Sequence, residues 1–308
     1  MKTISSRTEM RFADGTLVLT PVAKNAVRIQ YAKEHKYQLP EEWLYPDLKE
    51  QKASAMQVKV STKTEQVFIY DENDCLVTTI SKHDLAPTTV QGKEAYRASI
   101  VIDSPDDEYI TGLGQFQDGL GNLRGVSRRL TQVNTQISIP MMLSNKGYGL
   151  LWNNYGMVEY NPSEWKVDME RQEAKGDVEI VNVTSTEGGK KEVRQSNKFM
   201  AEIQIAEDGE YALLLDVGQT MARRHNLAVD DSTIIDVNNL WLPPTTSVNI
   251  DLKAGTHTFM SELTDGDKPS IHLRKVDNTT TFNSPVADKV DYTVFVGSAD
   301  EIISTYRA

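Results

Sequence analysis

The sequence has only one cysteine, Cys75, among its 308 residues. A single thiol excludes an internal disulfide and a metal cluster built on thiolates. Cys75 follows the turn-like run Asp-Glu-Asn-Asp and precedes an apolar run, which predicts a buried, unreactive thiol rather than a nucleophile. Long apolar runs are also missing, and the N-terminal residues lack the apolar stretch of a signal peptide. We therefore expect no membrane span and see no export signal in this stretch of chain.

Basic residues are in deficit: 33 Lys and Arg stand against 44 Asp and Glu, for a formal net charge of -11. A field of this sign repels nucleic acid and anionic lipid, so we expect neither as a partner. Neutral sugars, peptides and cations stay open as partners. The 5 histidines are scattered, and none of them forms the spacing of a local zinc motif. We accordingly predict no metal site and no cofactor.

Helix signals are scarce as well, whereas strand signals dominate. Short β-branched segments bounded by turn residues recur at roughly eight- to twelve-residue spacing, as in Thr16–Thr20, Ala26–Tyr31 and Met56–Ser61. This spacing is typical of antiparallel β-sandwiches rather than β/α units. One helix is expected, over Glu301–Tyr306, with Ser298 at its N-terminal cap. The prediction is an all-β fold with a packed core.

The sequence pattern changes at two points, one after Tyr160 and one after Val276, where polar and charged residues replace the alternating pattern of strands. We interpret the segment between them as a unit inserted into another, which close termini of the inserted unit make tolerable. The predicted arrangement is one β-sandwich built from residues 1–160 and 283–308. It is interrupted by a second, jelly-roll-like β-sandwich over residues 161–282.

The most informative stretch runs from Glu108 to Gly156. Four glycines let its first loop turn tightly, and a second polar run follows one strand later. Amide and carboxylate side chains suit the vicinal hydroxyls of a sugar, because each donates or accepts in a fixed direction. The same groups also cap turns, and composition alone favours that simpler role. The polar residues concerned are Gln115, Gln117, Asp118 and Asn122 in the loop, and Gln132, Asn134, Thr135 and Gln136 in the second run.

The arrangement of these residues resembles glycoside hydrolase family 31, the α-glucosidase and α-xylosidase family. The residues that carry the resemblance are Gly112-Leu113-Gly114-Gln115, Ser144-Asn145-Lys146-Gly147-Tyr148-Gly149, and the C-terminal segment from Asp291 to Arg307. The resemblance implies the galactose-mutarotase-like N-terminal β-sandwich of such enzymes, over about residues 10–160 and 285–308. It looks closest to bacterial α-xylosidase-type members that carry an insertion here.

The resemblance also implies a role for the two polar runs. In the family, loops of this sandwich help to form the substrate site, and the matching positions are Gln117, Asp118, Asn134 and Thr135. Members often have an aspartate where this chain has Asn134, so its amide retains hydrogen bonding but loses charge. The family's retaining hydrolysis needs two carboxylates, and both lie in a catalytic barrel that this chain lacks. We therefore predict no catalytic residue and no hydrolysis by this chain alone.

The inserted unit resembles, weakly, the lectin-like domain named after anthrax protective antigen. Asp230 and Asp231 are either a calcium pair or a strand-to-strand turn, and the turn is favoured. Trp241 is the best candidate for an aromatic platform under a sugar ring, although a role as a plug at the end of the sandwich is slightly favoured. Trp152 is expected in the core, Trp165 in the linker that leads into the second sandwich, and Trp43 either exposed or covering the first sheet.

The leading hypothesis is a non-catalytic N-terminal part of a bacterial α-xylosidase or α-glucosidase, which helps to shape the substrate site. Its partners would be an oligosaccharide or polysaccharide and the catalytic barrel of the same polypeptide. The compartment stays open, with export of the enzyme to the periplasm or cell surface as one option. The alternative is a free-standing carbohydrate-binding protein. A self-sufficient enzyme has little support, because no acid/base pair stands out.

Overall fold

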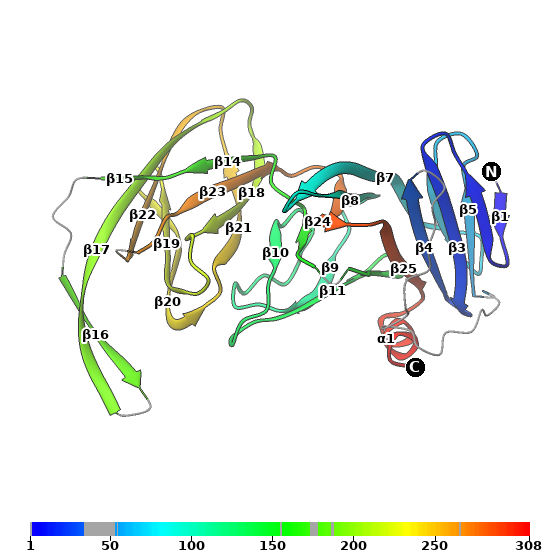
Figure 1. The fold of residues 1–308 in the computed structure, drawn as a ribbon. Helices are drawn as coiled ribbons and strands as arrows, with labels where there is room; N and C mark the ends of the chain where they lie inside the picture. The colour runs from blue at the N-terminus through cyan, green and yellow to red at the C-terminus, as the bar shows by residue number, and fades with distance from the viewer. Residues whose placement is uncertain are drawn as a thin grey trace.

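The computed structural model describes residues 2–33, 53, 55–154, 156–172, 178–185, 188–264 and 266–308. Every strand pair in this part of the chain is antiparallel, and the only helix found there is α1 (Ala299–Arg307). The predicted all-β fold is confirmed. The molecule consists of two units side by side, as Figure 1 shows.

The first sandwich has an eight-stranded and a seven-stranded sheet, built from both ends of the described chain. In sheet order, the eight strands are β1 (Lys2–Ile4), β5 (Met56–Val60), β6 (Val67–Asp71), β7 (Leu76–Val90), β8 (Lys93–Asp103), β24 (Thr279–Ala287), β13 (Val158–Tyr160) and β10 (Arg128–Leu130). The seven strands are β2 (Thr8–Arg11), β3 (Gly15–Ala23), β4 (Ala26–Lys33), β25 (Val290–Val296), β12 (Tyr148–Trp152), β11 (Ile137–Ser144) and β9 (Ile110–Gln115).

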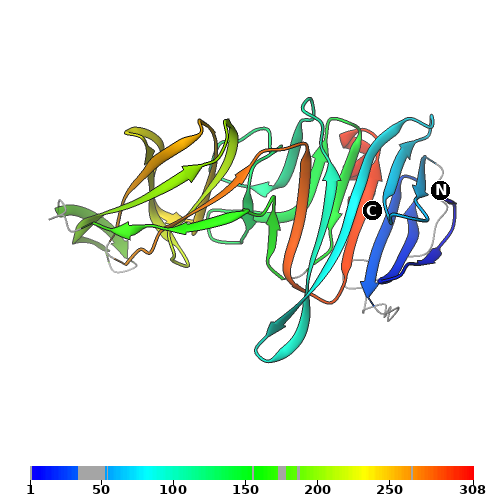
Figure 2. The ribbon, with the colours of Figure 1, turned by 90° about the horizontal axis from the view of Figure 1, so that it is seen from above.

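The second sandwich uses only strands that lie between β13 and β24 in the sequence. Its four-stranded sheet runs β14 (Trp165–Asp168), β23 (Ser270–Lys275), β18 (Gly209–Asp216) and β21 (Thr245–Leu252). Its six-stranded sheet contains β15 (Glu170–Arg171), β17 (Gly188–Ile205), β22 (Gly255–Thr264), β19 (Ala222–Val229) and β20 (Ser232–Leu242), with β16 (Val178–Ser185) paired to β17. Figure 2 shows the two sandwiches end to end from above.

Burial patterns explain why these segments become strands. β5 alternates buried and partly exposed residues, as expected of a strand with one covered face. β25 and β12 are buried on both faces, because α1 and its surroundings cover the outside of their sheet. Ile302 of α1 is buried in a small cluster with Leu151 and Phe295. The predicted helix and its cap are confirmed: Ser298 and Glu301 form a reciprocal capping box.

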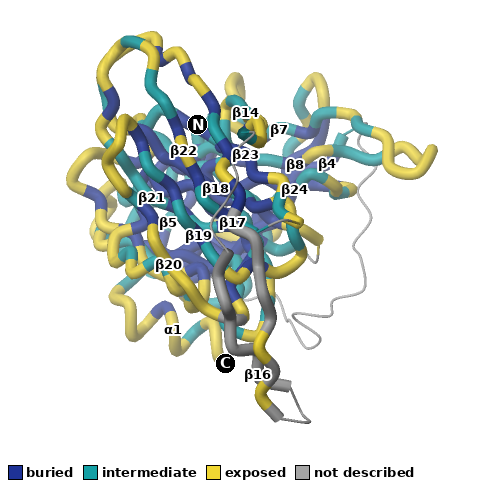
Figure 3. The backbone as a smooth tube through the Cα atoms, turned by 90° about the vertical axis from the view of Figure 1, so that its left-hand side faces the viewer, coloured by how far each residue is buried: buried dark blue, intermediate teal, exposed yellow. Residues whose placement is uncertain are grey.

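Each sandwich has its own apolar core. The large cluster of the first includes Trp152, 1% exposed, which confirms its predicted core position. The cluster of the second is built around residues such as Phe259 and Leu213 and contains no residue of the first cluster. Figure 3 shows the buried residues inside and the exposed ones on the turns and edges. The two units are therefore stabilised separately by burial of apolar surface.

Several predictions for single residues need correction. Cys75 is exposed rather than buried, because it ends a tight turn in which Asp71 accepts hydrogen bonds from the backbone, and the sheet that covers the strand begins further on. Trp165 lies in strand β14, not in a linker, and packs edge-on against Tyr211. Trp43 and His35 lie outside the described residues.

The chain passes from one sheet system to the other between β13 and β14 and returns between β23 and β24. The predicted second unit spanned residues 161–282, but Thr279–Phe282 already pair with β8 of the first sandwich. The first sheet system therefore takes up the chain again at β24. Among the described residues, no helix is long and apolar enough to cross a membrane.

Candidate functional site

The glycine-rich loop begins in β9, where the backbone conformation and the close approach of the next strand require two glycines. Gly112 and Gly114 have φ values of 106° and 103°, which favour glycine. A Cβ on Gly114 would stand 2.1 Å from the carbonyl oxygen of Ile137, and one on Gly112 would stand 2.5 Å from that of Met141. These glycines let β9 approach β11 across an irregular register. Their role is structural, and they hold the start of the polar loop in place.

The Ser144-to-Gly149 motif is also structural. Its two hydroxyl groups, from Ser144 and Tyr148, donate to Glu108 Oε1 at 2.5 and 2.7 Å. Asn145 Oδ1 accepts from the backbone N–H of Tyr109 at 2.7 Å. Glu108 is 2% exposed, so this network satisfies a buried carboxylate. The motif thereby fixes the turn after β11 against the start of β9.

Asp118 does not present a free carboxylate. Arg128 Nη2 lies 2.6 and 2.5 Å from its two oxygens, and the two side chains are only 8% and 4% exposed. The guanidinium of Arg128 also stacks 4.1 Å from the centre of the Phe116 ring. Asn122 is likewise occupied, since its Oδ1 accepts from the backbone of Ile110 and Arg124. Asp118 and Asn122 therefore shape the loop.

Gln117, Asn134 and Thr135 are placed differently. Gln117 is exposed and its Nε2 donates to the backbone oxygen of Thr135 at 3.3 Å, which ties the two polar runs together. Asn134 is exposed, and within the described residues its side chain has no hydrogen-bond partner. Its amide is free to bind a ligand. The structure thus joins residues 18 positions apart into one surface.

Trp241 lies beside this surface although it belongs to the second sandwich. The hydroxyl of Thr135 donates to the backbone oxygen of Trp241, across 106 residues of sequence. The indole is 45% exposed on β20, so it is not a plug inside the sandwich. Gln117, Asn134, Thr135 and Trp241 form what we call the composite rim. Two candidate sites that were separate in the sequence analysis are neighbours in the molecule.

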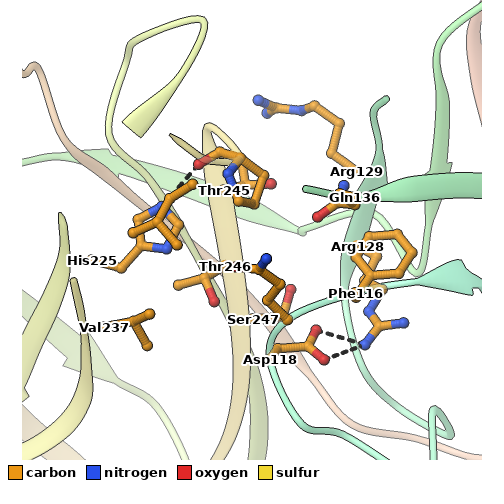
Figure 4. Close-up of a pocket in the computed structure, with 13 residues that line it drawn as sticks. Phe116, Asp118, Arg128, Arg129, Gln136, His225, Val237, Thr245, Thr246 and Ser247 are labelled. Atoms are coloured by element: carbon orange, nitrogen blue, oxygen red, sulfur yellow. Dashed lines mark hydrogen bonds and ion pairs between the residues drawn. The ribbon is translucent and has the colours of Figure 1, made fainter. Parts of the chain in front are cut away.

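A pocket lies next to the composite rim, between the two sandwiches. It is partly open to solvent, and its walls combine loop residues such as Phe116 with residues of β19 to β21. Figure 4 shows Asp118 and Arg128 on one side and His225 and Val237 on the other. Pockets at domain interfaces commonly bind small molecules. The full lining is Phe116, Gln117, Asp118, Arg128, Arg129, Gln136, His225, Val237, Leu242, Pro243, Thr245, Thr246 and Ser247.

The electrostatics of the pocket suit a neutral ligand. The charge of Arg128 is balanced by Asp118, and that of Arg129 by Asp216, with 2.6 Å between Arg129 Nη1 and Asp216 Oδ2. Burial lowers the pKa of His225 to about 4, so its imidazole is neutral at pH 7 and bonds to the carbonyl of Pro243. Hydroxyl, amide and aromatic groups then make up the remaining recognition surface.

The surface offers recognition chemistry rather than a reacting pair. Asp118, the predicted site residue with a carboxylate, is held by Arg128, and the other rim residues are amides, a hydroxyl and an indole. Asp230 and Asp231 form the turn between β19 and β20, with φ values of 47° and 66°, which confirms the favoured interpretation. Within the described ranges, no group of three or more His, Cys, Asp or Glu side chains is arranged to hold a metal.

Sequence reasoning missed Phe116, Arg128, Arg129, His225 and the Thr245–Ser247 segment. The consecutive arginines, Arg128 and Arg129, were one indication in the sequence, because cationic side chains that lie between strands need anionic partners. Their use depends on residues far away: Arg129 reaches Asp216, and Ser247 Oγ donates to the backbone oxygen of Ser127. Periodicity and local motifs do not indicate such contacts.

Comparison with known proteins gives sequence relatives for part of the chain. No family model matches it. An uncharacterized family 31 glucosidase from Pseudescherichia vulneris is 38% identical over 74 residues, which are 23% of this chain and 14% of that protein. An alpha-xylosidase from Saccharolobus solfataricus is 28% identical over 114 residues, 34% of this chain and 15% of that protein. The matched regions thus span only a small part of the curated relatives.

Solved structures match the whole chain. A family 31 alpha-xylosidase from Xanthomonas citri has a TM-score of 0.75 at 19% identity, covering 100% of this chain and 40% of that one. A family 31 alpha-xylosidase from a soil metagenome, solved with xylose, has a TM-score of 0.54 at 15% identity, with 100% and 34% covered. The chain thus shares its fold with part of these proteins. Both kinds of match are thus to family 31 glycosidases: part of the sequence is similar to two of them, and the fold is similar to part of two others.

Proposed function

We propose that this chain is a non-catalytic β-region of a family 31 α-glycosidase, an α-xylosidase or α-glucosidase that acts with retention. In that enzyme it forms one side of the substrate site. The observation that supports this most is the composite rim, where an unpaired amide, Asn134, lies on the loop that contacts the backbone of Trp241. Amides bind sugar hydroxyls and an indole stacks on the C–H face of a sugar ring.

The proposed partners are a glycan and a catalytic barrel. The second sandwich would act as a lectin-like unit that presents Trp241, while the first presents Gln117, Asn134 and Thr135. Asp118 would contribute by orienting the loop, since Arg128 occupies both of its oxygens. Catalysis would belong to two carboxylates outside this chain.

Hydrolysis by the isolated chain tests the non-catalytic part of the proposal. A purified sample incubated with an aryl α-xyloside and an aryl α-glucoside is expected to release no aryl alcohol above the rate in buffer. Turnover that copurifies with the chain and is absent from a mock preparation would contradict the proposal.

Binding tests the recognition part. Titration with oligosaccharides ending in α-xylose is expected to give heat with the wild-type chain, and several-fold weaker binding with Asn134→Ala. Asn73→Ala serves as the control, because Asn73 is an exposed amide in a turn of the first sandwich. Equal affinities for all three proteins would remove Asn134 from the proposed site.

A free-standing carbohydrate-binding protein is the second candidate. The composite rim supports it too, because every residue of the rim belongs to this chain. The coding sequence that follows residue 308 separates the two candidates. Continuation into alternating strands and helices favours the glycosidase, and a stop codon favours the binding protein.

A further inference from the structure

The boundary between the two sandwiches carries several polar contacts. Within the described residues, the two core clusters have no member in common. Arg129 lies between two hollows, because it lines both the pocket beside the composite rim and a second one beside β18 and β23. Polar contacts at this boundary therefore contribute to the relative orientation of the two units.

One set of polar contacts lies where the chain passes between the sandwiches. Asn161 is fully buried with a φ of 47°, and its Oδ1 accepts from Arg274 Nη1 at 2.9 Å and from the Thr281 backbone at 2.8 Å. Its Nδ2 donates to the carbonyl of Val126 at 3.0 Å. These bonds fix the crossing point of the two connections. A single crossing point still leaves rotation about it unrestrained.

A second set lies on strands β10, β18 and β21. The Arg129–Asp216 ion pair joins β10 to the end of β18, and both side chains are largely buried, with 23% and 17% exposed. Ser247 Oγ of β21 donates to the Ser127 carbonyl at 2.5 Å. Asp216 also accepts from the backbone N–H of Gly218 at 2.9 Å, which fixes the orientation of its carboxylate. This set restrains the rotation that Asn161 leaves open.

We propose that Arg129 and Asp216 are positioning residues that hold Trp241 against the Asn134–Thr135 loop. The ion pair is partly shielded from water, so it is stronger than a surface pair and its loss leaves a partly buried charge unpaired. The Thr135 contact with the Trp241 backbone is a single hydrogen bond, and it does not hold two domains by itself. The geometry of the composite rim therefore depends on the Arg129–Asp216 pair. Its role in glycan binding rests on the function proposed above.

A distance measurement tests the positioning without any ligand. Cys75 is exposed in the first sandwich and is the only native cysteine, so it takes one spin label. Glu202→Cys, on the exposed face of β17, takes the second. Pulsed electron paramagnetic resonance should give one narrow distance distribution for this doubly labelled chain. Adding Arg129→Ala, or Asp216→Ala, should broaden or shift the distribution.

Two further variants separate positioning from folding. Arg129→Lys should keep the narrow distribution, because the observed contact uses a single nitrogen, Nη1, which an ammonium can replace. Lys146→Ala, which removes a comparably shielded cation paired with Asp107 inside the first sandwich, should also leave the distribution unchanged. An Arg129→Ala distribution as narrow as that of the wild type, in a sample with native circular dichroism, would overturn the proposal. If Arg129→Ala does not fold, the Asp216→Ala sample decides in the same way.

Glycan binding gives the second readout. Oligosaccharides ending in α-xylose should bind Arg129→Ala several-fold more weakly than the wild type, and Arg129→Lys within about twofold of it. Equal affinity for Arg129→Ala and wild type, despite a broadened distance distribution, would show that the positioning does not serve the rim. A glycan that binds none of the variants, wild type included, would contradict the proposed function, while the distance distributions alone would still decide on the positioning.

Discussion

At the scale of single residues, buried neutral histidines make the chain sensitive to acid. Burial lowers the pKa of His83, of His225 and of His272 to about 4, which is below the 6.5 of an unfolded chain. The unfolded state then binds more protons between these two values. Stability is fully present above pH 6.5 and falls as the pH drops toward 4.

His225 provides a test of this acid sensitivity. Lowering the pH from 7 to 5 should cost roughly 2 kcal/mol of unfolding free energy for a histidine of this kind. In His225→Gln the loss of unfolding free energy between pH 7 and pH 5 should be smaller by about that amount, even if the variant is less stable at pH 7. Urea unfolding at pH 7 and pH 5 measures both differences. If the variant loses as much unfolding free energy between pH 7 and pH 5 as the wild type, His225 does not contribute the expected acid sensitivity.

His257 has the opposite effect on the pH dependence of stability. Both ring nitrogens face acceptors, the Lys253 carbonyl at 2.8 Å and Asp230 at 2.5 Å, and the pKa of His257 is raised first by the former bond and then by the latter. Its contribution to stability is present at pH values below the pKa of the unfolded state. That contribution is lost as the pH rises through the pKa of the folded state. The ring is close to the surface, so the effect on stability should be small.

The two glycines of β9 and its loop allow a matched comparison. Gly114→Ala places a Cβ against the Ile137 carbonyl at a positive φ and should cost at least about 2 kcal/mol of stability. Gly119→Ala also has a positive φ, 73°, but nothing lies within 4 Å of the new methyl group, so about 1 kcal/mol is expected. Thermal unfolding of both variants compares them. A larger loss for Gly119→Ala would argue against the close approach of β9 to β11.

At the scale of elements, β4 and β25 are joined by a buried ion pair. Arg28 Nε and Nη2 lie 2.9 and 2.6 Å from the oxygens of Asp291, Gln30 donates to the same carboxylate at 2.8 Å, and the pair is 4% exposed on each side. The contact links strands more than 260 residues apart in sequence. It ties both ends of the described chain into one sheet.

Breaking this pair should strongly destabilise the first sandwich. Asp291→Ala is expected to lower its unfolding free energy by about 3–5 kcal/mol, because it leaves the Arg28 charge buried without that partner. Glu9→Ala is the control, since Glu9 pairs with Arg11 on the surface of the same sandwich, where the two side chains are 40% and 71% exposed. Denaturant unfolding measures both. A loss below about 1 kcal/mol for Asp291→Ala would contradict the assigned role of the pair.

Most elements were predictable because their patterns are local. β4, β5 and α1 were expected near their observed bounds from strand-forming residues, turns and the Ser298 cap. The β7–β8 hairpin has a weaker local strand pattern, since Lys82 to Arg97 is polar and includes Pro87. Pairing with each other and with β24 keeps these residues in strands. Tertiary contact of that kind has no local pattern.

At the scale of the whole molecule, part of the site was predictable and its assembly was not. Gln117, Asn134, Thr135 and Trp241 stood out by residue type and by resemblance. Their meeting depends on the relative orientation of two sandwiches, which is fixed by contacts such as Arg129 with Asp216 and Ser247 with Ser127. Asp118 shows the converse: its residue type suggested a ligand contact, whereas Arg128 holds it within the loop.

The central claim is that the composite rim binds sugar. The most direct measurement is isothermal titration of an oligosaccharide ending in α-xylose into the wild type, Trp241→Ala and Tyr306→Ala. Tyr306, 42% exposed on α1, matches the 45% exposure of Trp241 but lies outside the rim. We predict binding by the wild type and Tyr306→Ala, and at least about a tenfold loss for Trp241→Ala, as expected for removal of a stacking platform. Binding by Trp241→Ala as tight as that of the wild type, or no binding by any of the three, would contradict the claim.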